Sequence, residues 1–342
     1  QLRQRMVYAL SQILVISNAG GDALTDYPEA VAYHQSVLTE FGFGNYRNLL
    51  EAMTYSPGMG FYLTYMGNQK EDPETGRQPD ENYAREILQL FTMGLVALND
   101  DGTLAGGLND PDSSFELYDN HDITGLAKVF TGLDRRVSRA EAKNNPEAPE
   151  VLNSWREPMV VYPAKHAQNE KTFLGLTIPE NTNAVDSITL ALDQLMSVAS
   201  VGPFLSRQLI QRFTTSNPSP AYISRVTQVF NDGRYTLPNG IGIGGGLRGD
   251  LKATIAAILL DRENLEPEAP NTFGKLREPV LRFTQWARAF SAGTVTPEYT
   301  LELYDLFSTS NYGQGLAQHP FSAPSVFNFY RPGYVPPGTD SG

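Results

Sequence analysis

The hydrophobic and polar positions of this chain follow a helical period over most of its length, and the stretch 81–94 shows it best. Its apolar residues recur three or four positions apart, which places them on one face of a helix. These residues are Tyr83, Ile87, Leu90, Phe91 and Gly94. Asp80 stands at the N-cap position, and the closing glycine is typical of a helix end. We therefore expect one continuous helix over 81–94, packed in the core and covered by the segments on both sides.

A second stripe on the same helix is polar. Asn82, Glu86 and Gln89 recur at i, i+4 and i+7, along the edge of the apolar face. Glu86 is either a partner in a structural ion pair or hydrogen bond, or a catalytic or metal-ligating carboxylate, and both interpretations stay open. If the protein has a site, we expect Asn82 and Gln89 to contact its ligand, with Arg85 bracing it.

Similar patterns predict helices before and after this stretch. Their ranges are 1–17, 27–41, 43–53, 59–66, 120–132, 185–198, 201–213, 221–231, 251–260, 275–290 and 297–307. The segment 158–179 differs, because two β-prone runs, 159–162 and 172–178, flank a polar turn. It predicts a small hairpin with His166 near its tip. The expected fold class is therefore mainly α, a multi-helix orthogonal assembly with one small β-hairpin near 158–179.

The domain organisation follows from the same pattern. We expect a single large helical domain over 1–342, truncated at both ends, because the first helix begins without a capping residue. A subdivision stays open, with an N-terminal helical half over 1–135, a hairpin insertion over 155–180 and a C-terminal helical half over 183–342.

Composition narrows the classes of function. The chain has 26 basic and 38 acidic residues, a net charge of −12, which argues against nucleic acid as a main partner and disfavours anionic membrane surfaces. It has no cysteine, which removes thiol nucleophiles, thiolate metal sites and disulfides together. No apolar run approaches the length of a transmembrane helix.

Two histidines are candidate metal ligands. His34 lies on the apolar stripe of the helix 27–41, where it is either a hydrogen-bonded core residue or a ligand. His121 lies near the start of the helix 120–132, which we expect Asp122 or Asn120 to cap. A positive charge is disfavoured at that end of a helix, so His121 would stay neutral and able to bind a metal. The acidic stretch 100–122 lacks the spacing of a calcium-binding loop and reads as a solvated loop.

No local motif names a reaction. The chain has neither a zinc-type His-Glu-x-x-His, nor a serine nucleophile elbow, nor a phosphate-binding loop. One hypothesis is a binding or scaffold protein of the cell envelope, with another envelope protein as an open partner. The other is a metal-dependent hydrolase or oxidoreductase using Glu86 with one or more of His34, His121 and His166. A divalent metal, the oligomeric state and the question of enzyme activity stay open.

Several blocks along the chain together resemble a bacterial protein family, the domain of unknown function 1800. The blocks are 1–12, 81–94, 122–132, 166–175, 204–210, 274–279 and 324–328, and they are spread over nearly the whole chain. The resemblance implies an extracytoplasmic protein, periplasmic or extracellular, and no established reaction. Through the block 166–175 it adds His166 as a second catalytic candidate and Lys171 as a ligand-binding candidate.

The chain departs from the resembled family at two positions. The family commonly has histidine where Phe91 stands, and aspartate where Ala167 follows His166. If either position were part of a metal site in the family, the site in this chain would be weakened.

Overall fold

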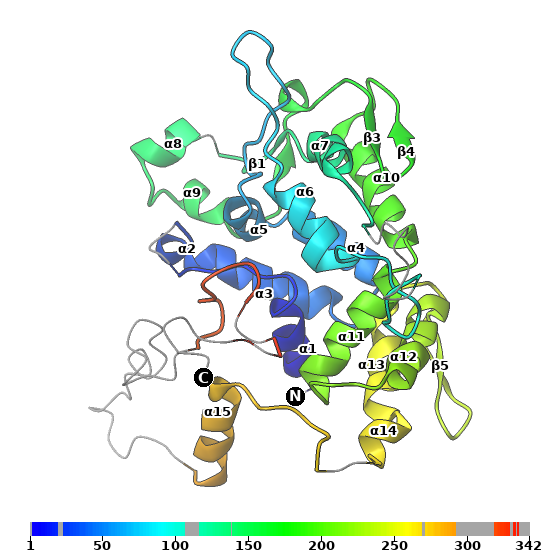
Figure 1. The fold of residues 1–342 in the computed structure, drawn as a ribbon. Coiled ribbons are helices and arrows are strands. Elements are labelled where there is room, and N and C mark those ends of the chain that lie inside the picture. The colour runs from blue at the N-terminus through cyan, green and yellow to red at the C-terminus, as the bar shows by residue number, and fades with distance from the viewer. Residues whose placement is uncertain are drawn as a thin grey trace, which may run out of the picture.

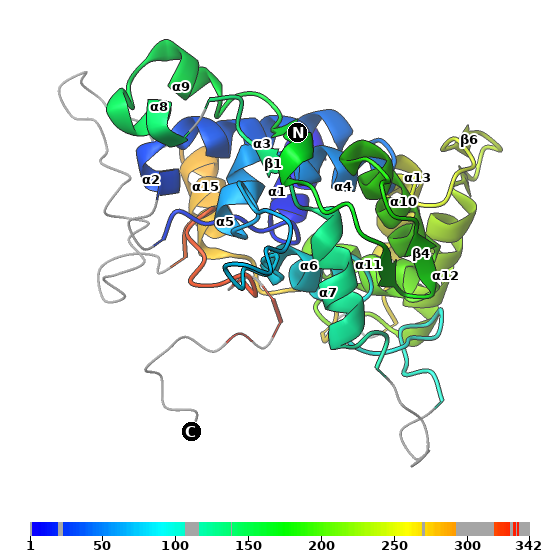
Figure 2. The ribbon, with the colours of Figure 1, turned by 90° about the horizontal axis from the view of Figure 1, so that it is seen from above.

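The computed structural model describes residues 2–19, 23–106, 116–137, 139–268, 271–291, 318–328, 331–332 and 334. Its helices run in several directions around one another rather than as a parallel bundle (Figures 1 and 2). The strands of the described part form three small antiparallel sheets of two strands each. The predicted fold class, mainly α with a small hairpin, is confirmed, whereas the helix predicted over 297–307 lies outside the described residues.

The N-terminal part consists of helices that pack their apolar faces together. They are α1 (Leu2–Ser11), α2 (Ala23–Asp26), α3 (Pro28–Phe41), α4 (Tyr46–Thr54) and α5 (Pro57–Tyr62). α1 ends at Ser11, earlier than predicted, but the chain that follows it through Ile16 stays buried. The Asn45 side chain caps α4 by accepting from the Arg47 backbone N–H at 2.9 Å, as the sequence suggested.

The centre of the chain is not one continuous α-helix, so that part of the prediction is wrong. α6 (Asn82–Glu86) passes directly into a π-helix, η1 (Ile87–Thr92), in which hydrogen bonds span five residues instead of four. Gly94 follows with a positive φ of 78°, close to the predicted helix end. The N-cap position is Glu81 rather than Asp80, although the Asp80 carboxylate accepts from the Asn82 backbone N–H at 2.8 Å.

Short elements follow along the chain, and the first of them packs against α6. They are α7 (Asn120–Val129), β1 (Leu133–Asp134), α8 (Arg139–Asn144), α9 (Pro149–Asn153), β2 (Val160–Val161), η2 (Pro163–Lys165), β3 (Lys171–Phe173) and β4 (Leu176–Ile178). The hairpin near 158–179 exists, but its strands are β3 and β4, whereas β2 pairs with β1. The predicted pairing of 159–162 with 172–178 is therefore wrong, and His166 is buried rather than at a hairpin tip.

α7 and β3 approach each other closely because Gly125 has no side chain. A Cβ on Gly125 would come within 1.9 Å of the Thr172 carbonyl oxygen. The glycine thus lets the helix lie against the strand, and this contact fixes where the 166–175 segment sits.

The C-terminal part completes the core. It contains α10 (Ala184–Ser197), α11 (Val201–Phe213), α12 (Pro220–Asp232), β5 (Tyr235–Thr236), β6 (Gly242–Ile243), α13 (Leu251–Leu260), α14 (Arg262–Leu265) and α15 (Pro279–Ala289). One connected set of buried apolar side chains runs from Met6 of α1 through Phe91 to Ile258 of α13. The division into domains stays a prediction. α15 lies apart from α11–α13 in Figure 1 and has no buried residue.

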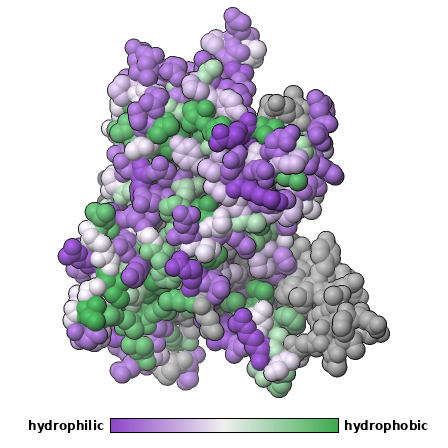
Figure 3. Space-filling model, turned by 180° about the vertical axis from the view of Figure 1, so that it is seen from behind, coloured by the Kyte–Doolittle hydropathy of each residue, from purple (hydrophilic) through white to green (hydrophobic). Residues whose placement is uncertain are grey.

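The face of the molecule drawn in Figure 3 is mostly polar. Seen from behind, hydrophilic residues dominate, and apolar residues gather on the side where α12–α14 lie (Figure 3). Among the described helices, none has by itself the length and apolar character needed to span a membrane. α10 and α11 meet these criteria only as a pair, which bends by 78° between them.

Candidate functional site

Glu86 lies at the junction of α6 and the π-helix, where it is buried without a full set of partners. Its side chain is 7% exposed, and Oε2 makes no hydrogen bond. Burial raises the pKa of Glu86, against the opposing charge of Arg85. Tyr118 lies near Glu86, and burial together with the Glu86 charge raises the pKa of its phenol to about 12. The Tyr118 hydroxyl is also buried without a hydrogen bond. A carboxylate and a phenol, both without partners, therefore lie near each other beside a π-helix. Short π-helices are frequent at functional sites.

Asn82 of the predicted polar stripe and the neighbouring Arg85 make local contacts. The Asn82 side chain donates to Thr64 Oγ1 at 3.4 Å, and Arg85 pairs with Glu81 at 3.4 Å in an exposed i,i+4 contact. Gln89 is half-buried. Whether this stripe lines a ligand site stays a prediction.

His34 is a buried core histidine. Its Nε2 lies 3.1 Å from the Leu14 carbonyl oxygen, so Nε2 carries the proton and Nδ1, which has no partner, is left as an acceptor. The Phe321 ring meets the imidazole edge-on at 6.2 Å between centroids. Burial lowers the pKa of His34 to about 4, although its hydrogen bond to Leu14 opposes the shift. The ring is therefore neutral at physiological pH and braces α3 against the segment after α1.

His121 lies in the first turn of α7, within a capping arrangement. Asp119, rather than the predicted Asp122 or Asn120, is the N-cap and accepts from the backbone N–H groups of His121 at 2.7 Å and Asp122 at 3.1 Å. Asp122 returns a bond from the Asp119 N–H at 3.0 Å and also accepts from Leu174 N–H at 2.6 Å. The ligand-type atoms of these three residues lie within 4.8 Å of one another, the one such group in the described part of the chain. The carboxylates of Asp119 and Asp122 are thus already hydrogen-bonded in the cap of α7.

Lys171, Asn169 and Glu71 form a partly buried polar network, and His166 lies near enough to Lys171 to feel its charge. His166 Nδ1 donates to the Thr131 carbonyl at 2.9 Å, which leaves Nε2 buried and without a well-formed hydrogen bond. Lys171 Nζ donates to the Asn169 carbonyl at 3.3 Å, and the Asn169 amide donates to Glu71 Oε1. Glu71 Oε2 and Asn169 Oδ1 are buried and unpartnered as well.

The pKa values of the two basic groups, His166 and Lys171, are both lowered, which favours their neutral forms. Burial is the first cause of the lowered pKa of His166, reinforced by Lys171 and opposed by hydrogen bonds to the backbone of Thr131 and Thr182. Burial also lowers the pKa of Lys171, helped by the charge of Lys128 and opposed by Glu71. The imidazole and the amine therefore lie near each other, and the carboxylate lies near the amine.

The structure thus separates the predicted site residues into groups. No hydrogen bond or ion pair within the described ranges joins Glu86 to His34, His121 or His166. The carboxylate near Lys171 is Glu71, which sequence reasoning missed. Glu71 lies in a charged loop about a hundred residues upstream, and no spacing pattern connects that loop to the hairpin.

The two positions that depart from the resembled family are both packed. The Phe91 ring lies 6.5 Å from that of Tyr83 between centroids, and the Ala167 backbone N–H donates to Thr131 Oγ1 at 2.9 Å. Neither side chain can ligate a metal, so a metal site that used either position would lack that ligand here.

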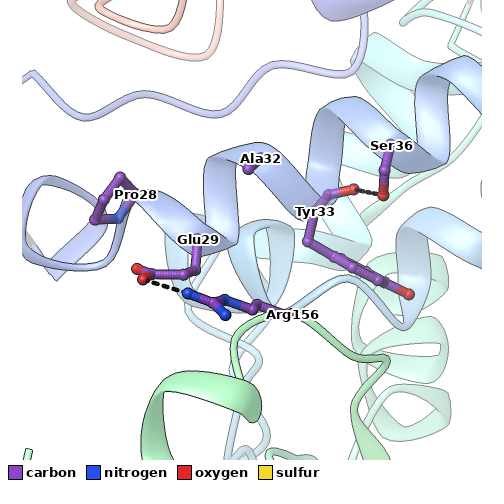
Figure 4. A pocket seen from close by; sticks show the side chains of 6 residues that line it. All are labelled: Pro28, Glu29, Ala32, Tyr33, Ser36 and Arg156. Carbon is purple, nitrogen blue, oxygen red and sulfur yellow. Dashed lines mark hydrogen bonds and ion pairs between the residues drawn. The ribbon is translucent and has the colours of Figure 1, made fainter. Parts of the chain in front are cut away.

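One hollow lies on α3, and none of the predicted site residues lines it. Figure 4 shows Pro28, Glu29, Ala32, Tyr33 and Ser36 along one face of the helix, with Arg156 reaching in from the chain after α9. Arg156 is already neutralised there by Glu29, at 2.9 Å. This hollow of about 530 Å³ therefore offers little free charge to a ligand.

A second hollow, of about 410 Å³, is rich in positive charge. We call it the basic cleft, and it lies among the end of α11, the start of α15 and residues 318, 331, 332 and 334. Its charged lining residues are Lys275, Arg277, Glu278, Arg282 and Arg331. Lys275 is paired with Glu278 at 2.8 Å, whereas Arg282 has no side-chain partner among the described residues. Sequence reasoning noticed the block 274–279 only as part of a resemblance, because the cations meet through two segments distant in sequence.

Comparison with known proteins gives one result. A family model described as "Protein of unknown function (DUF1800)" matches residues 1–341, and no curated protein and no solved structure matches the chain.

Proposed function

Because the chain belongs to the DUF1800 family, whose description assigns no reaction, we propose a function from its geometry: it is an extracytoplasmic protein that binds an anionic ligand in the basic cleft. The observation that carries this proposal is the charge of the cleft. Four cations and one carboxylate line it, on a chain whose net charge is −12. A concentration of cations against the overall sign of a protein supports an anion as ligand.

The kinds of cation also support anion recognition. Three of the four are arginines, whose planar guanidinium groups can bind a carboxylate or phosphate through two parallel hydrogen bonds. Arg277 is held by the Gln285 side chain, and Arg331 lies 5.8 Å over the Phe327 ring, so both are oriented before a ligand arrives. Preorientation reduces the entropy lost on binding.

Binding is favoured over catalysis at this cleft. Its described lining includes no histidine, and its one carboxylate, Glu278, is tied to Lys275. A scaffold role in the cell envelope fits the same surface, and location outside the cytoplasm rests on the family resemblance alone. The alternative, a metal-dependent enzyme using Glu86 with His34, His121 or His166, gains no support from a shared hydrogen bond or ion pair in the described ranges.

Calorimetric titration with inorganic phosphate, sulfate and succinate at low ionic strength tests the proposal. We expect binding that weakens with added salt, because exposed charges are screened. Arg282→Gln should weaken it about tenfold, the loss of one charge-assisted contact. Arg288→Gln, on the same helix but outside the cleft, is the matched control. Absence of binding by all three anions, or an equal loss in both variants, refutes the proposal.

A further inference from the structure

Glu278 gives the basic cleft a feature that a simple anion would leave unused. Its side chain is 5% exposed, and it stands at the N-cap position of α15. Oε1 accepts from Lys275 Nζ at 2.8 Å, but Oε2 is buried and has no hydrogen bond. A buried carboxylate oxygen without a donor is costly, so a ligand that supplies a donor would gain from it.

Two nearby cations keep N–H groups that have no partner among the described residues. Lys275 Nζ also donates to the Arg212 carbonyl at 3.0 Å, which leaves the third of its N–H groups available. Arg212 itself donates to the carbonyls of Gln208 at 2.9 Å and Gln12 at 3.1 Å, and its Nε has no partner. Burial lowers the pKa of Arg212 to about 10, opposed by the Glu278 charge, which places the two groups near each other.

We propose that the ligand of the basic cleft is a polyhydroxy acid of the sugar-acid class, which places its carboxylate on the arginines and donates a hydroxyl to Glu278. This inference rests on the proposed function and names the ligand class of the same site. A hydroxyl both donates and accepts, so one group could meet Glu278 Oε2 and accept from Lys275.

An ammonium group fits the same position less well. It would satisfy Glu278 as a donor, but it would add a positive charge among Lys275 and the three arginines of the cleft. Like charges at these distances repel, and they select against a wrong ligand. A neutral hydroxyl donor meets no such repulsion.

The shape and the remaining walls suit a ring-shaped ligand. The volume of about 410 Å³ lies in the range of small-molecule sites. Leu276, 83% exposed, and the prolines Pro279 and Pro332 offer apolar surface beside the charged groups. One face of a sugar ring is apolar, whereas its substituents carry the hydroxyl and carboxylate groups.

Titration of the full chain with three matched probes tests this inference. Glucuronate carries both the carboxylate and the hydroxyls, cyclohexanecarboxylate carries only the carboxylate, and methyl glucoside carries only the hydroxyls. We expect glucuronate to bind at least tenfold more tightly than either of the others, since a hydrogen bond to a charged group is worth about 1.5–3 kcal/mol. In Glu278→Gln, the preference over cyclohexanecarboxylate should fall below about threefold, while Arg288→Gln keeps it.

The outcomes separate this inference from the function on which it rests. Equal binding of glucuronate and cyclohexanecarboxylate by the unaltered chain overturns the sugar-acid class and leaves anion binding in place. Absence of binding by every anion overturns both. This comparison needs no variant, so it holds even if Glu278→Gln does not fold. An oligouronide that binds more tightly than glucuronate points to a polymer end, and equal binding points to the free sugar acid; either result supports the class.

Discussion

The buried imidazole of His34 should make the fold sensitive to mild acid. Its pKa is 6.5 when exposed in the unfolded chain and about 4 in the fold. Between these values the unfolded chain binds a proton that the folded chain does not, so stability falls as the pH falls below 6.5. The full shift of about 2.5 pKa units corresponds to about 3 kcal/mol. At pH 5 about 2 kcal/mol of this is already lost, and below pH 4 the loss is complete.

The substitution His34→Gln isolates this effect. A glutamine amide can donate to the Leu14 carbonyl, as Nε2 does now at 3.1 Å, but it does not titrate. When the pH falls from 7.5 to 5, both proteins should lose free energy of unfolding. We expect the loss in the variant to be about 2 kcal/mol smaller than in the unaltered chain. Urea denaturation followed by circular dichroism at both pH values measures the difference.

The control is the exposed histidine of the α7 cap. His121→Gln makes the same substitution at an exposed position, so it shows what replacing a histidine does outside the core. If the unaltered chain and His34→Gln lose the same stability on acidification, the imidazole is not the titrating group and the reasoning is refuted.

Other predictions follow from buried groups. Burial raises the pKa of Glu86, so the fold should lose stability as the pH rises above 4.5. Glu86→Gln should remove that loss. Elemental analysis should show equal metal content in the variant and the unaltered protein. Burial lowers the pKa of Lys171, so keeping this amine buried costs stability at pH values below its folded pKa, and the cost shrinks toward pH 10.5. Lys171→Met should therefore raise the melting temperature by a few degrees at pH 7 and by little at pH 10.5. A lower melting temperature of the variant at pH 7 would contradict this. Gly125→Ala should lower the free energy of unfolding, measured by urea titration, by several kcal/mol, because the new Cβ would come within 1.9 Å of the Thr172 carbonyl oxygen. Gly245→Ala is the control: its Cβ would lie 3.7 Å from its nearest neighbour, so this variant should fold normally.

The parts of the fold that sequence anticipated rest on local regularity. The period of apolar residues located α3, α4, α10, α11, α12 and α13, and the Asn45 cap was recognisable from residue type and position. The π-helix was not recognisable, because Ile87–Thr92 has the same apolar spacing that an α-helix would need. Its additional residue is accommodated by tertiary contacts, such as the Tyr46 hydroxyl donating to the Phe91 carbonyl at 2.7 Å.

The candidate sites were less accessible for a physical reason. His166 and Lys171 lie in one short segment, so a local pattern could mark both. Glu71, whose charge acts on Lys171, reaches this segment only through the tertiary fold. The basic cleft is similar, since Arg331 joins Arg277 and Arg282 across a long stretch of chain. Sequence reasoning found residues of suitable chemistry and could not determine which of them meet.

The π-helix also bears on how this chain tolerates changes in length. A helix that receives one inserted residue can confine the excess to a single wide turn and leave its two ends where they were. η1 (Ile87–Thr92) has that form, between α6 and the glycine that ends the element. Deleting one residue there would shorten the wide turn to an ordinary one, whereas the same deletion inside α3 would rotate half of a buried face into solvent. Among the helices that the structure describes, this one at the centre of the core therefore has a conformation ready to absorb a deletion.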